Sequence, residues 1–197
     1  MRKFEVCKGF EKAGVNLPVR STSESAGYDV EAIEDVVIPS IWGQFLNAIE
    51  FIPAITECQL TDGLDDDGFF EEAGNLKTIP AHIAFKPSVE NPKGTLVKTG
   101  LKAYCNLKEY VALVSRSSGF NKKGLMLANN YGVGDADYPD NLENDGHLQF
   151  NFINFGFTDV LIKKGERIGQ ILFVDHNVTD FDRAEGIRSG GWGSTGS

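Results

Sequence analysis

The sequence predicts an all-β fold, either a compact barrel or a sandwich of two sheets. Its apolar runs are short and are bounded by Gly, Pro, Asn or Asp, as expected of strands joined by tight turns. The chain contains 22 glycines and 14 phenylalanines, and 41% of its residues are hydrophobic, which is enough to form one core. At 197 residues, the simplest expectation is a single domain over 1–197 that carries an insertion.

Strands are expected along most of the chain. Residues 1–39 have the pattern of short strands and turns, with Pro18 and a Ser/Thr run among the turn residues. Beyond the insertion, short apolar runs favour strands over 78–85, 94–104, 109–115, 123–129, 147–155, 159–164 and 169–176. This spacing is typical of a barrel or a sandwich.

Residues 40–78 differ from the rest and are predicted to be an insertion. A helix is expected over 41–51, ending before Pro53, because apolar residues recur there at helical spacing: Ile41, Trp42, Phe45, Leu46 and Ile49. The stretch DGLDDDGFFEEAG at 62–74 is acidic. It places Leu64 and Asp67 where a calcium loop requires an oxygen ligand and a glycine, so a solvated loop is favoured over a metal site.

Net charge and cysteine content argue against several classes of protein. The formal net charge of −9 argues against nucleic-acid binding, which requires basic patches. No apolar stretch approaches the roughly 18 residues of a membrane span, and the first residues lack the apolar segment of a signal peptide. The three cysteines are far apart and form no CxxC pair. We therefore expect reduced thiols in a cytoplasmic protein, without disulfides or a zinc site.

The arginines, of which there are only six, indicate a phosphate site. Arg116 in SRSSGFNKKG, Arg167 in KKGERIGQ and Arg188 in RSGGWGSTGS stand beside serines and glycines. A guanidinium group can donate two hydrogen bonds to a phosphate, and glycines let backbone N–H groups approach it. Each arginine alone is better explained as a surface residue in a turn, but three such contexts in an arginine-poor chain favour an anion site.

Carboxylates and an aromatic residue occur in similar contexts. Asp135 and Asp137 in GVGDADY are two residues apart, so on a strand they would project from the same face. A carboxylate near a polyphosphate can bind a metal or deprotonate a water, although a turn-capping Asp is the simpler explanation of each. Asp29 in SAGYDV is a third acid of this kind. Trp192 lies in the glycine-rich tail 189–197, where it would stack on a nucleobase or pack on the protein's own surface.

Taken in order, the stretches AGYDV, SRSSG, GVGDADY, GERIGQ and RSGGWGSTG resemble the five motifs of the homotrimeric dUTPase family. The resemblance covers the chain from about residue 18 to its end, except for 40–78, and insertions like this one occur in some Gram-positive bacterial and phage members. It implies a jelly-roll-like β fold, hydrolysis of dUTP to dUMP and pyrophosphate, and a homotrimer with shared active sites. It also implies that 183–197 form a flexible arm that closes over an active site shared with other subunits, with a neighbouring chain as its scaffold.

The same resemblance implies roles for individual residues. Asp135 would be the general base that activates the water attacking the α-phosphorus, whereas Asp137 would be structural. Asp29 would reach Mg²⁺ through water, because the triphosphate itself would chelate the metal. The residues implied to bind the substrate dUTP are Arg116, Ser117, Ser118, Asn129, Tyr138, Gln170, Arg188, Trp192, Ser194 and Thr195.

These substrate contacts divide by the part of the nucleotide. Asn129 and the backbone of the hairpin after it would bind the uracil edge, Trp192 would cover the uracil, and Tyr138 would leave no room for a 2′-hydroxyl. The γ-phosphate would be bound by Arg188, Ser194 and Thr195. Other phosphate oxygens would be bound by Arg116, Ser117, Ser118 and Gln170.

Two departures from the family pattern affect the expected structure. Gly134 replaces an aliphatic residue, so a loose or bulged strand is expected before Asp135. PDNLENDGH at 139–147 replaces a short turn, so a longer loop is expected beside the sugar pocket.

Two other functions stay open at this point. GVGDADY disfavours a relative of dCTP deaminase, an enzyme with a similar fold that uses a glutamate near the nucleobase. A catalytically silent regulatory or partner-binding protein on the same fold would use 40–78, where Trp42 and Phe45 share one helix face. The simpler explanation of that face is a helix that caps its own barrel.

Overall fold

A computed structural model of the chain describes residues 1–52, 55–59, 75–79, 81–85, 93–186, 188, 190 and 191. The chain divides into two compact units. We call Met1–Gly43 with Lys93–Ser197 the barrel unit, and Gln44–Pro92 the inserted unit. The insertion predicted at 40–78 overlaps the inserted unit, and its bounds stay a prediction.

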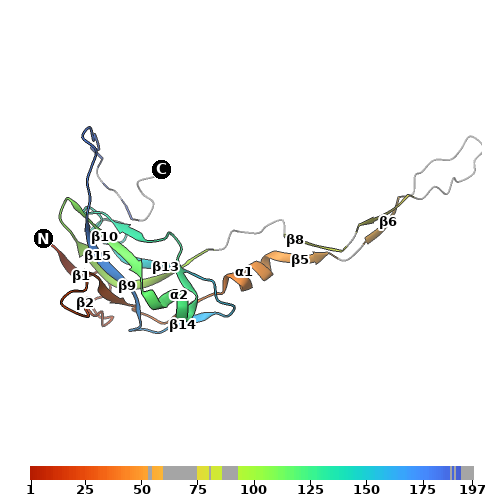
Figure 1. The fold of residues 1–197 in the computed structure, drawn as a ribbon, viewed down its shortest axis with the longest axis horizontal. Coiled ribbons are helices and arrows are strands. Elements are labelled where there is room, and N and C mark those ends of the chain that lie inside the picture. Colours follow the sequence, from red (N-terminus) through yellow and green to blue (C-terminus); the bar gives the residue numbers. More distant parts are fainter. Residues whose placement is uncertain are drawn as a thin grey trace, which may run out of the picture. The chain divides into compact units, whose positions relative to one another are not determined.

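One sheet of the barrel unit has four antiparallel strands in the order β1-β9-β13-β11 (Figure 1). Its strands are β1 (Lys3–Val6), β9 (Thr95–Tyr104), β13 (Leu148–Asn154) and β11 (Leu125–Leu127). Along β13, every second residue is buried, beginning with Leu148. This period of two is the pattern of a strand with one face against a core.

The second sheet has five antiparallel strands in the order β12-β10-β15-β3-β2. They are β12 (Gly132–Gly134), β10 (Glu109–Ser115), β15 (Arg167–Asp175), β3 (Tyr28–Glu31) and β2 (Val19–Arg20). A separate pair joins β14 (Val160–Ile162) to β4 (Val36–Ile38). The described residues include two short helices, α1 (Ile41–Ala48) and α2 (Ser117–Lys123), so the predicted all-β fold is confirmed. Both helices are too short to cross a lipid bilayer.

The core of the barrel unit is formed by side chains from both sheets. Leu148 and Phe150 of β13 and Leu113 and Ile171 of the five-stranded sheet are each at most 2% exposed. Burying one such side chain contributes about 1.5–3 kcal/mol to stability. Gly169 belongs to this packing, because a Cβ atom at its position would overlap the Phe150 ring. Gly169, the second glycine of GERIGQ, is therefore required by the packing of the core.

Gly134 does not loosen its strand, so that prediction was wrong. β12 pairs with β10 in continuous register, with Gly134 opposite Val111 and Gly132 opposite Leu113. A Cβ atom at 134 would lie 3.4 Å from Val111 Cβ, at the limit of ordinary contact. Gly134 thus lies in a regular strand, and its position has room for a Cβ atom.

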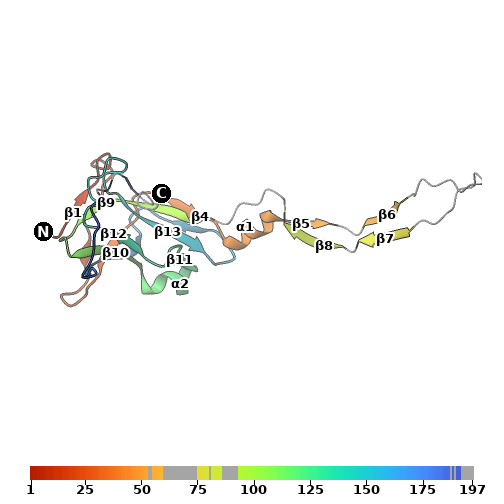
Figure 2. The same ribbon diagram turned by 90° about the horizontal axis from the view of Figure 1, so that it is seen from above.

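The described residues of the inserted unit form two antiparallel strand pairs, whose strands are labelled in Figure 2. In one, β5 (Ile49–Ile52) pairs with β8 (His82–Phe85), and in the other, β6 (Ile55–Gln59) pairs with β7 (Asn75–Ile79).

Both predictions made for the inserted unit need correction. The helix expected over 41–51 ends at Ala48, because the next four residues pair with β8. The strand expected over 78–85 is two strands, and the sequence has Pro80 between them, whose nitrogen cannot donate to a ladder. The acidic stretch 62–74 lies outside the described residues.

Candidate active site

Three adjacent strands bring polar side chains together at one end of the five-stranded sheet. Gln170 of β15 lies opposite Val114 of β10 on one side and opposite Asp29 of β3 on the other. Arg116 follows β10 directly, and its Nη1 donates to the carbonyl oxygen of Arg167 at 3.3 Å. We call the following residues the phosphate-side cluster: Ser21, Asp29, Arg116, Arg167 and Gln170.

Asp29 lies at the centre of this cluster, with a side chain only 9% exposed. Its Oδ2 accepts hydrogen bonds from Arg167 Nη1 at 3.0 Å and Ser21 Oγ at 2.9 Å, and its Oδ1 accepts one from Gln170 Nε2 at 3.2 Å. Burial alone would raise the pKa of Asp29. The hydrogen bonds and the charge of Arg116, 3.8 Å away, outweigh burial and hold that pKa below its usual range. Asp29 is therefore an anion that orients two arginines.

The helix α2 carries the predicted phosphate-binding serines. Ser117 is exposed and Ser118 is half-buried, and both lie in the first turn after Arg116. The helix stops at Gly124, which has a φ of 66° and whose N–H donates to Phe120 O at 2.8 Å. Glycine suits this left-handed conformation, so the chain reverses here and enters β11.

A tight turn over 128–131 joins β11 of one sheet to β12 of the other. Asn129 is exposed in this turn, and its carbonyl oxygen accepts a hydrogen bond from Tyr131 N–H at 2.7 Å. Asn130 adopts a φ of 69°, a conformation that asparagine tolerates better than most residues. The residue predicted to bind uracil is thus held at an accessible hairpin tip.

Asp135 and Asp137 lie in a turn, not on a strand, so the strand assumed for them was wrong. The strand β12 ends at Gly134, and Tyr138 N–H closes the turn by donating to Asp135 O at 3.0 Å. The two carboxylates still converge, because Arg188 donates to both: Nε to Asp137 Oδ1 at 2.9 Å and Nη2 to Asp135 Oδ2. The Asp135 side chain nevertheless stays 51% exposed.

Tyr138 is buried beside these carboxylates. Its hydroxyl donates to His147 O at 3.1 Å and accepts from Asn144 Nδ2 at 3.0 Å. The guanidinium carbon of Arg188 lies 5.6 Å from the ring centroid. Burial raises the pKa of Tyr138, which is therefore a neutral ring in a fixed position. We call the following residues the nucleoside-side cluster: Asp135, Asp137, Tyr138 and Arg188.

The two clusters lie at opposite ends of β10. Gly134 pairs with Val111, so Asp135 is level with Tyr110, whereas Arg116 follows the other end of the strand. Six residues along a strand span roughly 20 Å. Within one chain, Asp135 and Arg116 are therefore too far apart to contact the same phosphate group.

Comparison with known proteins explains why these residues occur together. A family model described as dUTPase matches residues 80–196. The deoxyuridine 5'-triphosphate nucleotidohydrolase of Lactococcus lactis subsp. lactis (strain IL1403) is 36% identical over 199 aligned positions, which cover 100% of this chain and 99% of that protein. The chain belongs to the dUTPase family.

Solved structures show the same fold as this dUTPase. The dUTPase from Streptococcus mutans aligns with a TM-score of 0.59 and 26% identity, over 90% of this chain and 98% of that chain. The dUTPase from phage phi11 of S. aureus aligns with a TM-score of 0.55 over 96% of this chain and 99% of that chain. At 15% identity, this second alignment supports the fold only.

The structure of this dUTPase places most of the predicted site residues in one of the two clusters or beside Arg116, and their roles stay predictions. Trp192, Ser194 and Thr195 lie outside the described residues. Sequence reasoning gave no role to Ser21 or to Arg167, although the glycine-rich context of Arg167 had indicated phosphate. It also missed Asn144, because a loop residue carries no periodic signal.

Proposed function

We propose that Asp135 is the general base of this dUTPase and activates the water that attacks the α-phosphorus of dUTP. The reaction itself, hydrolysis of dUTP to dUMP and pyrophosphate, follows from membership of the family. The observation that supports Asp135 is its exposed carboxylate, which lies in the turn that ends at the buried Tyr138. A water-accessible carboxylate beside a fixed ring that would seat the sugar is the arrangement that this chemistry needs.

The proposed reaction is an in-line displacement at the α-phosphorus. The Asp135 carboxylate takes a proton from the water as its oxygen attacks. The bond from the α-phosphorus to the bridging oxygen breaks, and pyrophosphate leaves with the electron pair. Donors on the opposite side of the nucleotide would stabilise the developing charge, namely Arg116, Ser117, Ser118 and Gln170.

The nucleoside-side cluster and the hairpin at Asn129 would select the substrate. Asn129 and the backbone of its hairpin would bind the uracil edge, and the ring of Tyr138 would exclude a 2′-hydroxyl. In this proposal Arg188 exchanges its bonds to the two aspartates for bonds to the γ-phosphate. The arm residues Ser194 and Thr195 would join it there, and Trp192 would cover the uracil.

Magnesium is the metal that the dUTPase family generally uses, and a structure of a phi11 dUTPase mutant is described as revealing a structural Mg(II) ion. The described residues contain no group of three or more His, Cys, Asp or Glu side chains that could hold a metal. Asp29 engages both of its oxygens with Arg167, Ser21 and Gln170, which suits contact through water better than direct ligation. Bound Mg²⁺ would supply charge neutralisation on the phosphates.

A second copy of the chain is needed to complete this site, because the two clusters of one chain are roughly 20 Å apart. Gln170 and Asp29 lie on the face of the five-stranded sheet that points away from the core. Apolar side chains share that face, namely Ala112, Val114, Val133, Leu172 and Val174.

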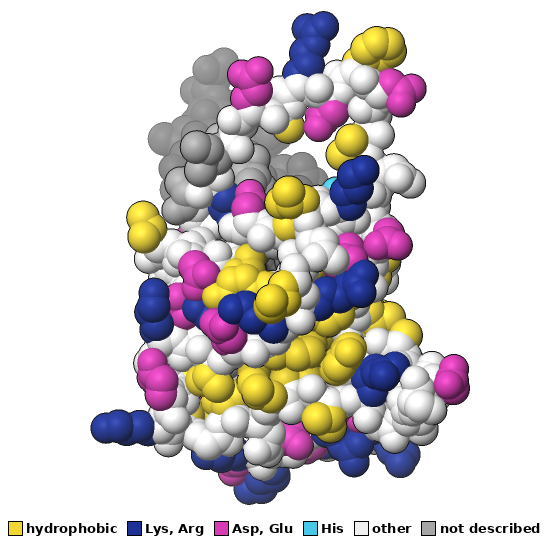
Figure 3. Space-filling view, turned by 90° about the vertical axis from the view of Figure 1, so that its left-hand side faces the viewer, with side chains coloured by type: hydrophobic (Ala, Val, Ile, Leu, Met, Phe, Trp, Pro, Cys, Tyr) yellow, Lys and Arg dark blue, Asp and Glu magenta, His cyan; other side chains and the backbone are white. Residues whose placement is uncertain are grey.

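Hydrophobic side chains are exposed on the surface, and Val133 on this face of the sheet is one of them. In Figure 3, hydrophobic side chains gather in a patch with Lys and Arg side chains around it. Exposed apolar patches of this kind mark interaction surfaces. We therefore propose that partner copies in a homotrimer bring their nucleoside-side clusters to this chain's phosphate-side cluster.

The alternative functions have less support. The curated relatives are named as dUTP nucleotidohydrolases, which does not favour a deaminase or a silent protein. A protein partner on 40–78 stays a secondary hypothesis. The Trp42 ring stacks on Phe157 with centroids 6.0 Å apart, and its Nε1 donates to Phe155 O at 3.2 Å. Trp42, itself a residue of the barrel unit, thus packs within that unit and offers less of its surface to a partner.

The proposal is tested by measuring pyrophosphate release, with Mg²⁺, from dUTP, UTP, dCTP and dTTP in parallel, while ammonia is monitored with dCTP. We expect rapid release from dUTP alone, because Tyr138 excludes ribose and the hairpin excludes other bases. Release from UTP at a similar rate would contradict the role of Tyr138. Ammonia from dCTP, or no release from any of the four nucleotides, would overturn the proposed function.

A further inference from the structure

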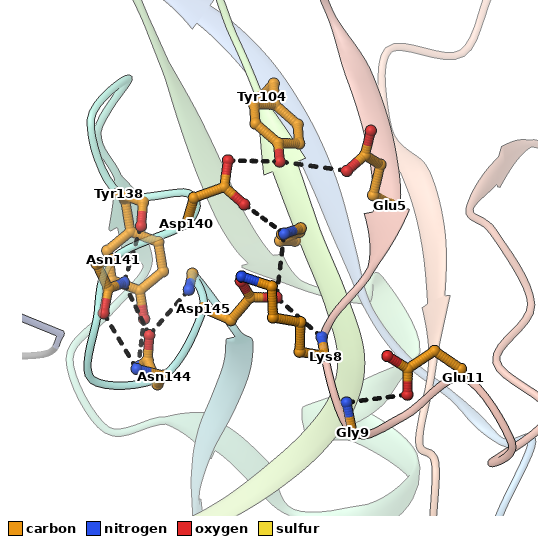
Figure 4. Close-up of polar contacts among 12 residues, drawn as sticks. Glu5, Lys8, Gly9, Glu11, Tyr104, Tyr138, Asp140, Asn141, Asn144 and Asp145 are labelled. Atoms are coloured by element: carbon orange, nitrogen blue, oxygen red, sulfur yellow. Dashed lines mark hydrogen bonds and ion pairs between the residues drawn. The ribbon is translucent and has the colours of Figure 1, made fainter.

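The loop over 139–147, which joins Tyr138 to β13, is held in shape by two asparagines (Figure 4). Asn141 Oδ1 accepts the N–H of Asn144 at 3.1 Å, and Asn141 Nδ2 donates to Tyr138 O and to Asn144 Oδ1, both at 2.8 Å. Gly146 adopts a φ of 77°, and a Cβ atom there would lie 2.5 Å from backbone on the other side of the loop. These contacts give the loop one defined conformation.

The side-chain amide of Asn144 has one orientation that satisfies its neighbours. Its Oδ1 accepts from Asn141 Nδ2 at 2.8 Å and from Gly146 N–H at 3.0 Å, so the atom facing these two donors is the oxygen. Nδ2 therefore faces Tyr138 and donates to its hydroxyl at 3.0 Å. That hydroxyl in turn donates to His147 O at 3.1 Å. Because it accepts one bond and donates another, the hydroxyl is fixed in both place and direction.

A buried lysine ties the loop to β9 of the four-stranded sheet. The side chain of Lys102 is only 6% exposed, and its Nζ donates to Asp145 Oδ2 at 3.0 Å and to Asp140 Oδ1. Both aspartates have a positive φ, 57° at Asp145 and 61° at Asp140, a conformation that aspartate tolerates better than most residues. Burial alone would lower the pKa of Lys102, but the two carboxylates raise it, so the ammonium stays charged. A paired charge thus holds the loop at both left-handed positions.

His147 forms a second link between the loop and β9. Its buried Nε2 accepts the N–H of Gly100 at 2.9 Å and that of Thr99 at 3.3 Å. Both hydrogen-bond partners of the Tyr138 hydroxyl are therefore anchored on the same strand, His147 directly and Asn144 through the loop that Lys102 holds. The four-stranded sheet, and not the Tyr138 turn itself, determines where this hydroxyl lies.

We propose that Asn144 is a positioning residue that sets the preference of this dUTPase for deoxyribose over ribose. The inference rests on the proposed function, in which the ring of Tyr138 excludes a 2′-hydroxyl. Discrimination against so small a group requires a ring that cannot tilt, and such rings are held by bonds to neighbouring side chains. Asn144 supplies one of the hydrogen bonds that prevent a tilt, and it acts on the sugar through the Tyr138 hydroxyl.

The experiment compares UTP, dTTP and dUTP as substrates of the enzyme with Mg²⁺. We expect Asn144→Ala to raise kcat/KM for UTP relative to dUTP about 3- to 10-fold, the scale of one lost hydrogen bond. The ratio for dTTP relative to dUTP should not change, because the Asn129 hairpin, and not Tyr138, is proposed to select the base. A smaller folded fraction would lower all three rates together and would leave both ratios unchanged. Asn16→Ala is the matched control, since Asn16 Nδ2 donates to Glu31 Oε2 at 2.9 Å elsewhere, and it should keep both ratios.

A double-mutant cycle tests whether Asn144 acts through the Tyr138 hydroxyl. Tyr138→Phe keeps the ring and removes the hydroxyl, so it should raise the UTP ratio by itself. In that background Asn144→Ala should add little, because the bond between the two side chains is already lost.

The possible outcomes separate this inference from the function on which it rests. An unchanged UTP ratio in folded Asn144→Ala, or the same increase in both backgrounds, would overturn the inference alone. Where Asn144→Ala does not fold, an unchanged UTP ratio in Tyr138→Phe would overturn it. An unaltered enzyme that does not hydrolyse dUTP, or that hydrolyses UTP equally fast, would instead overturn the proposed function and this inference with it.

Discussion

The two halves of the candidate site are built in different ways. The phosphate-side cluster lies on neighbouring strands, where the register of β10, β15 and β3 sets each side chain beside the next. The nucleoside-side cluster lies in turns, and its two aspartates are bridged by an arginine from the C-terminal segment. One half depends on sheet pairing, and the other depends on contacts between loops.

This difference corresponds to the tasks proposed for the two halves. Asp29 is buried and holds Arg167 by a direct hydrogen bond, so the anion-binding groups need little rearrangement when phosphate arrives. Asp135 is half-exposed and bonded to Arg188 through Oδ2, and in the proposed mechanism Arg188 leaves this carboxylate for the γ-phosphate. The preformed half would bind the charge, and the adjustable half would perform the chemistry.

The largest effect is expected from Asp135→Asn, which removes the base and keeps the shape. Because general bases contribute about 10²–10⁴-fold to rate, kcat for dUTP should fall by that factor. The measurement is pyrophosphate release at saturating dUTP. Asp137→Asn is the control, since it loses the other carboxylate on Arg188, and it should lose less than about 10-fold. Equal losses in both variants would contradict Asp135 as the base.

As the pH falls, the nucleoside-side cluster should be destabilised at a higher pH than the phosphate-side cluster. His147, whose carbonyl holds Tyr138, accepts Gly100 N–H at 2.9 Å with Nε2, and burial lowers the pKa of His147 to about 4. The unfolded chain, with a histidine pKa of about 6.5, binds more protons below that pH. Stability should therefore be complete above about pH 6.5 and should fall by roughly 3 kcal/mol as the pH approaches 4. The lowered pKa of Asp29 has a consequence of the same sign but in a lower pH range, because its contribution to stability is lost only below about pH 3.9.

Urea unfolding between about pH 7 and 4.5 checks this prediction. His147→Gln should remove most of the pH dependence, whereas His176→Gln, at an exposed position, should keep it. A pH dependence that survives in His147→Gln would mean that another group controls the acid sensitivity.

A smaller effect is expected from Arg116→Ala in the phosphate-side cluster. Losing one charge-assisted hydrogen bond costs about 1.5–3 kcal/mol, so kcat/KM for dUTP should fall about 10- to 100-fold. Lys108→Ala is the control: it removes one positive charge, as Arg116→Ala does, but at an exposed position, and it should have little effect on kcat/KM. If both variants lose the same activity, the general charge of the protein, and not a local anion site, binds the substrate.

Much of the fold followed from local patterns. Short apolar runs bounded by turn residues, such as 147–155, predicted strands, because this signal depends on neighbouring residues only. The helix over 41–51 was predicted too long, and α2 was not predicted at all. For the first helix, pairing of 49–52 with the distant strand β8 decided where the helix ends.

The motifs identified the chemistry of the site but not its assembly. The sequence by itself determined the family and the residue types, because the arginines, serines, glycines and aspartates that we propose to bind and cleave dUTP occur in short contiguous stretches. Only the tertiary structure decided that Gly169 serves the core, that Arg188 lies on Asp135, and that the two halves sit at opposite ends of β10. These relations depend on strand register and on side chains far apart in the sequence, which no local pattern encodes.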